Sequence, residues 1–171
     1  MNILQEVLKE HSKAMCNRVV NYVGGDPDHF EDLVSTFLKG PYRVTQRAGW
    51  PLSYCVEAHP ELIKPHLKRL IQNLETPGIH VSVKRNTIRF LQFIPIPVKL
   101  QGTVAAICFD FLSDPKETIA VKVFSMTVLA NIAREQPDIR KELKIIIEDQ
   151  LPFGSAGFVN RANKVLKELK N

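Results

Sequence analysis

The sequence predicts an all-α protein, a right-handed solenoid of about four antiparallel helix pairs, from two features that recur along its 171 residues. The first is an apolar pattern at positions i, i+3, i+4 and i+7, which lie on one face of a helix. It returns every 37–39 residues, and fifteen of its sixteen positions are apolar. A helical repeat of this length is typical of stacked helix pairs that bury their apolar faces against each other. The four copies begin at Phe30, Leu67, Val104 and Leu143 and end at Phe37, Leu74, Phe111 and Gln150.

The second feature is a proline that follows each of these first helices. Proline in a short turn stops a helix, so its recurrence supports the same boundaries. The four prolines are Pro41, Pro77, Pro115 and Pro152, at spacings of 36, 38 and 37 residues. A second set, Pro27, Pro60 and Pro137, is followed each time by an acidic residue, which suits the start of the next helix. Residues 94–97 hold two prolines and are predicted to be extended.

The repeat divides the chain into units of one predicted helical-repeat domain over residues 1–171. The units cover about 1–28, 29–65, 66–102, 103–141 and 142–171, and the two terminal units are incomplete. The first is predicted from Leu4, Val7 and Leu8 and from a helix over residues 12–23 that ends at Gly24. The last second helix is predicted over residues 158–169, with a lysine-rich polar face that suits the end of a stack.

Composition indicates a globular protein of the cytoplasm. With 44% hydrophobic and 24% charged residues the chain can bury a core. It holds no apolar run near the roughly 18–20 residues of a membrane span, and its N-terminus lacks the apolar segment of a signal peptide. Cys16, Cys55 and Cys108 lie in apolar helical patterns, where free thiols fit a reducing compartment. The sequence does not indicate an oligomeric state.

No catalytic motif is present, and we predict no catalytic residue, no cofactor and no metal site. Cys55 and His59 are one helical turn apart and could in principle share a metal ion. No further Cys or His joins them at motif spacing, which favours a structural cysteine and a helix-end histidine. The sequence therefore favours a protein that is not an enzyme.

Two short motifs resemble the signature of HEAT repeats, the armadillo-type helical repeat family. Asp114-Pro115 in a turn is followed by Val121-Lys122 and then Leu129, and Val83-Lys84 with Leu91 matches the same part. Asp114 stands two residues further from Lys122 than the usual pattern, and the other turns lack the aspartate. The resemblance covers nearly the whole chain. It implies that the second helices line a concave surface that binds a partner.

The same resemblance groups three basic residues, Arg47, Lys84 and Lys122, as a structural ladder between repeats. They are spaced 37 and 38 residues apart. On a helical wheel Lys122 points into an apolar arc, so it must extend to water or find a carboxylate or a helix-end carbonyl. Contact with a ligand is the alternative interpretation.

The formal net charge of +5 lies entirely in residues 60–100, which hold seven Lys/Arg and two Glu. In a helix predicted over residues 83–94, Arg85, Arg89 and Gln92 share one polar stripe. This stripe could contact phosphates or an acidic protein surface, or it could be a solvated helix face. The equivalent positions of neighbouring repeats are Ala48/Leu52 and Val123/Thr127, so the basic stripe is local.

Trp50, the only tryptophan, is flanked by Gly49 and Pro51, which are predicted to interrupt a second helix. A kink there could present Trp50 to a ligand. Alternatively, Trp50 fills a gap between units and Pro51 starts the regular helix, so the sequence leaves open whether Trp50 is core or exposed.

We therefore predict a non-catalytic binding or scaffolding module whose partner is an acidic protein surface. The alternative is nucleic-acid binding through residues 60–100, because some HEAT-like solenoids are DNA alkylation-repair glycosylases that hold the duplex on a basic face. Such enzymes are expected to surround their site with several aromatics and an acidic residue, which one tryptophan does not supply. A homo-oligomer that pairs through apolar end units is a third interpretation. The candidate partner-binding residues are Trp50, Lys68, Arg69, Arg85, Arg89 and Gln92.

Overall fold

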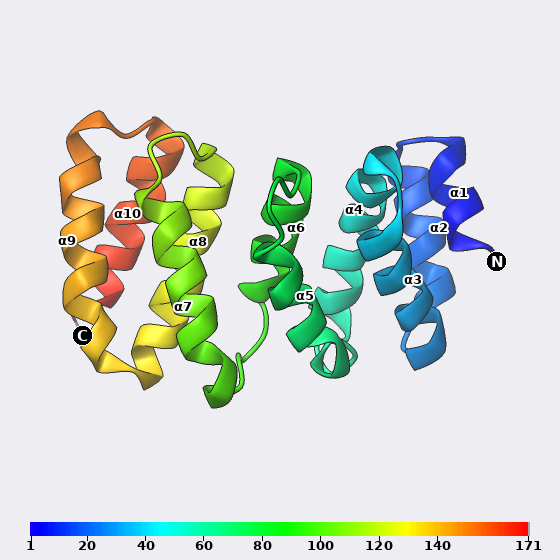
Figure 1. Ribbon diagram of the computed structural model, residues 1–171, viewed down its shortest axis with the longest axis horizontal. Helices are drawn as coiled ribbons and strands as arrows, with labels where there is room; N and C mark the ends of the chain where they lie inside the picture. The colour runs from blue at the N-terminus through cyan, green and yellow to red at the C-terminus, as the bar shows by residue number, and fades with distance from the viewer. Residues whose placement is uncertain (171) are drawn as a thin grey trace. The chain divides into compact units, whose positions relative to one another are not determined.

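The computed structural model describes residues 1–170, which form ten α-helices and three short 3-10 turns and contain no strand. The predicted all-α class is confirmed, and consecutive helices pack as pairs (Figure 1). The helices are α1 (Ile3–Lys9), α2 (Lys13–Val23), α3 (Pro27–Lys39), α4 (Tyr42–Ala58), α5 (Leu67–Leu74), α6 (Val81–Leu91), α7 (Val98–Ser113), α8 (Ile119–Glu135), α9 (Arg140–Gln150) and α10 (Ala156–Glu168). The 3-10 turns are η1 (Lys64–His66), η2 (Pro137–Ile139) and η3 (Leu151–Phe153).

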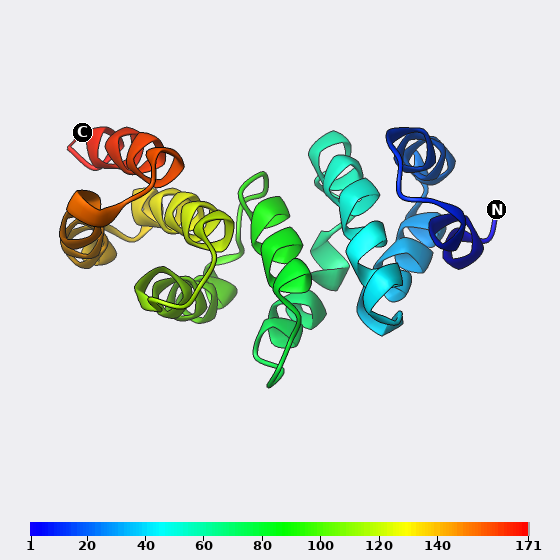
Figure 2. The ribbon, with the colours of Figure 1, turned by 90° about the horizontal axis from the view of Figure 1, so that it is seen from above.

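The chain divides into two compact units. The first extends from Met1 to Ile94 and holds α1 to α6, and the second begins at Pro95 and holds α7 to α10. The division falls in the segment 94–97, which contains no helix, as its two prolines predicted. Within each unit the helices lie side by side (Figure 2).

In the first unit, polar side chains fix where the helices begin. Asn2, Ser12 and Asp26 each accept a backbone N–H bond in the first turn of α1, α2 and α3, and Pro27 occupies the first turn of α3. Gly24 ends α2 with a φ of 48°, a backbone conformation that favours glycine. The predicted boundaries of α2 are therefore close to those observed.

The apolar repeat forms the core of each unit. In the first unit all eight of its positions, on α3 and α5, are buried. Phe30, Phe37 and Phe90 are among the largest fully buried side chains. The rings of Phe37 and Phe90 meet edge to face, with centroids 6.3 Å apart, so this contact joins α3 to α6. In α1 the buried apolar residues are Ile3 and Val7, whereas Leu4 and Leu8, which the pattern also assigned to the core, are exposed.

The second unit follows the same plan with α7 and α8 as one pair and α10 packed on α8. Leu143 and Ile147 of α9 are buried, whereas Phe111, Ile146 and Gln150 of the apolar pattern are half-buried. Gln101 is 4% exposed, and its amide donates to the Ile96 carbonyl oxygen at 3.0 Å and to Glu135 Oε2 at 2.8 Å. These bonds satisfy a polar group that would be costly to bury alone.

Two predicted helix boundaries are wrong. The helix α4 is continuous from Tyr42 to Ala58, so Gly49 and Pro51 neither interrupt it nor start it. Pro51 and Leu52 are buried, and packing of α4 against α3 and α6 outweighs the backbone hydrogen bond that Pro51 cannot donate. The helix predicted over residues 83–94 instead begins at Val81 and ends at Leu91.

Candidate functional site

A cavity of about 200 Å³ opens on the first unit where α4 and α6 pack together. Its lining comes from three parts of the chain. The link between α1 and α2 provides a histidine, α4 provides a glutamine and the tryptophan, and α6 provides two arginines and an asparagine. These residues are His11, Gln46, Trp50, Arg85, Asn86 and Arg89.

Gly49 makes room for the innermost side chain of this cavity. Asn86 is only 5% exposed, and a Cβ atom added to Gly49 would lie 2.4 Å from Asn86 Nδ2. Atoms at that distance overlap, so α4 can lie this close to α6 only because position 49 carries no side chain. The glycine that was predicted to interrupt α4 therefore seats the Asn86 amide beside the cavity.

Gly49→Ala is expected to destabilise the protein by about 1–2 kcal/mol, although alanine is the better helix former, because the added methyl group overpacks Asn86. Gly102→Ala is a matched control, since Gly102 is also helical but a Cβ there meets nothing within 4 Å. That control is expected to be neutral or to stabilise by up to about 1 kcal/mol. Urea unfolding of both variants measures the difference, and equal effects would contradict the close approach of Gly49 and Asn86.

Trp50 is half-buried, which answers the question that its sequence context left open. Its ring lies against that of His11, with centroids 5.6 Å apart and planes tilted by 53°. Together the two rings form an aromatic wall beside the arginines of α6. Trp50 thus borders the cavity from an unbroken helix and needs no kink to do so.

The cavity is positively charged, because its lining includes two guanidinium groups and no carboxylate. Arg85 is exposed and Arg89 is half-buried. The effect of Arg89 extends to Cys16 of α2, where burial raises the thiol pKa to about 11 while the charges of Arg89 and Lys13 act in the opposite direction. Gln92 caps the C-terminus of α6 and donates to the Arg89 carbonyl oxygen at 2.9 Å, but it does not line the cavity.

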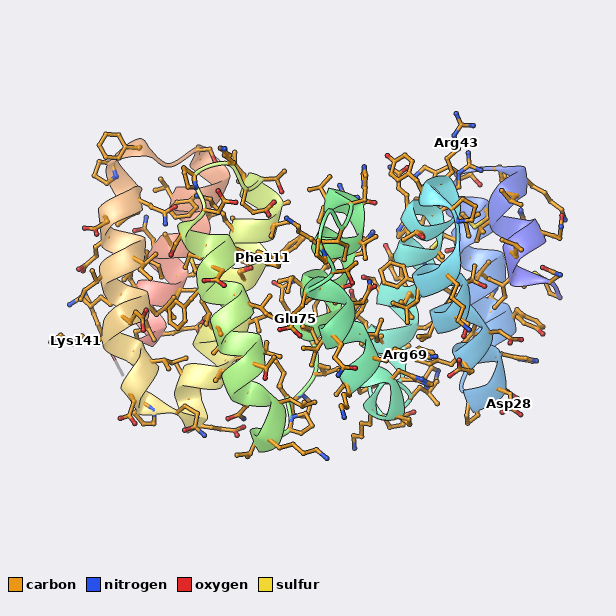
Figure 3. The ribbon with its side chains drawn as sticks, viewed as in Figure 1. Asp28, Arg43, Arg69, Glu75, Phe111 and Lys141 are labelled. Atoms are coloured by element: carbon orange, nitrogen blue, oxygen red, sulfur yellow. The ribbon has the colours of Figure 1, made fainter. Side chains whose placement is uncertain are left out.

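Lys68 and Arg69 lie on α5 and are not part of the cavity. Arg69 donates to both carboxylate oxygens of Glu31 on α3, at 2.9–3.1 Å, and lies beside that helix (Figure 3). A hydrogen bond from Ser35 and the contact with Arg69 lower the pKa of Glu31. Burial lowers the pKa of the neighbouring His66, whose Nδ1 is 3.1 Å from Glu31 Oε2. Arg69 is therefore engaged within the first unit.

The ladder residues Arg47 and Lys122 make hydrogen bonds that join helices. Arg47 Nη1 donates to the carbonyl oxygens of Val7 and Leu8, at 3.0 and 3.1 Å, at the end of α1. Lys122 Nζ donates to Gln150 Oε1 at 3.0 Å, and Gln150 in turn donates to the Leu112 carbonyl oxygen at 2.9 Å. Lys84 is half-buried on α6.

Two larger hollows differ from this cavity because carboxylates lie beside the lysines in their linings. One, of about 610 Å³, lies between the start of α1 and the end of α3 and includes both Asp32 and Lys39. The other, of about 510 Å³, lies in the second unit and includes Lys122 together with Glu117 and Asp149. Phe153 borders it and is 90% exposed. Neither hollow gathers two cations without a carboxylate.

Within the part of the chain that the structure describes, no group of three or more His, Cys, Asp or Glu side chains could hold a metal ion. Cys55 is buried, which raises its thiol pKa to about 12, and the Nδ1 atom of His59 lies 3.6 Å from Glu61 Oε1. A thiol with so high a pKa is a poor nucleophile at neutral pH. Among residues 1–170, no helix is both long and apolar enough to cross a membrane.

The sequence model of the HEAT repeat domain matches residues 3–169, which is nearly the whole chain. No curated protein and no solved structure matches the sequence.

Proposed function

Because the chain belongs to the HEAT repeat domain family, whose members are generally protein-interaction modules, we propose that it is a non-catalytic binding module for an acidic surface of another protein. The single observation that carries this proposal is the cavity of the first unit, in which Arg85, Arg89 and Trp50 lie together without a carboxylate. Arginine and tryptophan are the side chains most often responsible for affinity at protein interfaces.

The local charge supports an acidic partner. Residues 60–100 hold all of the net charge of +5, and Arg69 is paired with Glu31, whereas Arg85 and Arg89 reach a cavity without an acidic neighbour in its lining. Guanidinium groups bind carboxylates through paired hydrogen bonds, and a partly enclosed site strengthens such bonds. An acidic segment of a partner would bring the opposite charge to this site.

Nucleic acid is the second candidate, and the same two arginines are its basis. A duplex is held by many phosphate contacts spread along its backbone. The positions equivalent to Arg85 and Arg89 in neighbouring repeats are not basic, so the cationic surface is short. A short cationic cavity with an aromatic wall suits one acidic group of a protein better than a long phosphate backbone.

Trp50 provides a direct test, because it is the only tryptophan of the chain and borders the cavity. We expect poly-L-glutamate to change the tryptophan fluorescence of the intact protein, with an affinity that falls as salt is added. Double-stranded DNA is expected to bind no more tightly than the ~10⁻⁴–10⁻⁶ M of non-specific complexes at physiological salt. Submicromolar DNA binding without a response to poly-L-glutamate would contradict the proposed protein binding and support nucleic-acid binding as the function.

We further propose that the ladder residues stabilise the repeat array and do not bind the partner. Arg47 bonds the end of α1, and Lys122 bonds Gln150. Lys122→Glu is expected to destabilise the protein by about 2 kcal/mol, because the new carboxylate faces an amide oxygen near Asp149. Lys122→Met is expected to leave the free energy of unfolding, measured with urea, nearly unchanged. If both variants kept wild-type stability and lost partner binding, Lys122 would be a ligand contact.

A further inference from the structure

We propose that the cavity of the first unit receives a phosphoryl group carried by a side chain of the partner protein. This inference rests on the proposed protein binding and specifies the acidic group. It is based on the donors that surround the cavity, on the arrangement of the two arginines and on the size of the space.

The donors around the cavity outnumber the acceptors of a carboxylate. Arg85 and Arg89 each carry five N–H donors, and the amides of Gln46 and Asn86 and the ring of His11 can donate as well. A phosphomonoester presents three strong acceptor oxygens and a charge of about −1.5 to −2, whereas a carboxylate presents two oxygens and one charge. Two guanidinium groups match the charge of the phosphoryl group.

The two arginines stand one helical turn apart on the same side of α6. Like charges at positions i and i+4 of a helix repel each other and destabilise it. The cavity lining contains no carboxylate to relieve this repulsion. A dianion between the two side chains would relieve it, so the pair is better suited to the bound state than to the free state.

The cavity is small, and packing holds its innermost side chain. Asn86 is 95% buried in the space that Gly49 leaves open, and the ring of Trp50 lies against that of His11. The volume of about 200 Å³ is below the ~300–1,000 Å³ that is usual for small-molecule sites. The cavity therefore has room for one charged side-chain group and little room for a complete nucleotide.

The test compares two peptides that are identical except for one residue, phosphoserine or glutamate, by calorimetric titration of the intact protein. We expect the phosphoserine peptide to bind at least about 10-fold more tightly, because it offers more charge and a third acceptor oxygen. Arg89→Lys is expected to remove most of this preference, because lysine keeps the charge but lacks the planar pair of donors. Arg43→Ala, a change at an exposed arginine of α4 outside the cavity, is expected to leave both affinities unchanged.

Equal affinities for the two peptides would overturn the phosphoryl assignment and leave the binding of acidic proteins intact. Failure of both peptides, together with no fluorescence response to poly-L-glutamate, would overturn both proposals. Inorganic phosphate is titrated separately, and an affinity equal to that of the phosphopeptide would assign the cavity to free phosphate. Displacement of the phosphopeptide by submicromolar duplex DNA would assign the phosphoryl group to nucleic acid.

Discussion

The Arg85→Ala/Arg89→Ala double variant is expected to bind poly-L-glutamate at least about 30-fold more weakly than the wild-type protein. Removal of each arginine eliminates charge-assisted hydrogen bonds to the ligand that contribute roughly 1–2 kcal/mol to binding. A loss of 1.4 kcal/mol corresponds to a factor of ten in affinity. The fluorescence of Trp50 measures the loss. Thermal unfolding is expected to be unchanged or slightly improved, since removing two like charges from α6 removes their repulsion.

Arg43→Ala is the control for loss of a positive charge from the same unit. Arg43 lies on α4, and Figure 3 shows its side chain pointing outward from the end of that helix. We expect its affinity for poly-L-glutamate to stay within about twofold of the wild-type value, because exposed charges outside a contact act weakly at physiological salt. An equal loss in Arg43→Ala would show that net charge, and not the cavity, controls binding.

Phe90→Ala is expected to lower the free energy of unfolding by about 3–5 kcal/mol, the usual effect of removing a fully buried aromatic ring. Phe90 lies on α6 beside the arginines of the cavity and contacts Phe37 of α3. The loss is a large share of the roughly 5–15 kcal/mol that stabilises a typical domain. Urea unfolding measures it.

Phe93→Ala provides the matched control, because Phe93 lies two residues after the end of α6 and is 45% exposed. Its expected effect is within about 0.5 kcal/mol, as is usual for surface substitutions. If Phe90→Ala were equally mild, the contact between α3 and α6 would not contribute to the core in the way that the structure describes.

The helical repeat could be predicted because it depends on local periodicity. Apolar residues at helical spacing and prolines in the turns fix where most helices begin and end, and tertiary packing then buries the same faces. The predicted interruption of α4 was wrong because tertiary packing there outweighs local helix propensity. Gly49 and Pro51 are poor helix residues by local propensity, but their neighbours Ala48 and Leu52 are fully buried, and this packing keeps the helix continuous.

Half of the cavity lining could be identified from the sequence. The basic stripe indicated Arg85 and Arg89. Trp50 was singled out because a glycine and a proline flank it. Lys68 and Arg69 share the charge of the region, but they lie on the first helix of their pair, away from the cavity. Gln92 falls at the helix cap because α6 ends one residue before it.

His11, Gln46 and Asn86 were missed because they come from three separate segments that meet only after folding. One signal was present for Asn86. Gly49 and Asn86 are 37 residues apart, which is the length of the repeat, so they hold equivalent positions on neighbouring second helices. A glycine facing a buried amide at that spacing indicates a close approach of the two helices.

The claim that this cavity binds an acidic group of a protein is tested most directly by nuclear magnetic resonance of the intact protein during titration with a glutamate-containing peptide. We expect the largest shifts at the indole N–H of Trp50, at the side-chain amides of Gln46 and Asn86 and at the guanidinium Nε–H groups of the cavity arginines. Shifts centred instead on α5, or on the exposed Phe153 of the second unit, would contradict the assignment of the binding site. A spectrum unchanged at millimolar peptide would contradict the proposed function itself.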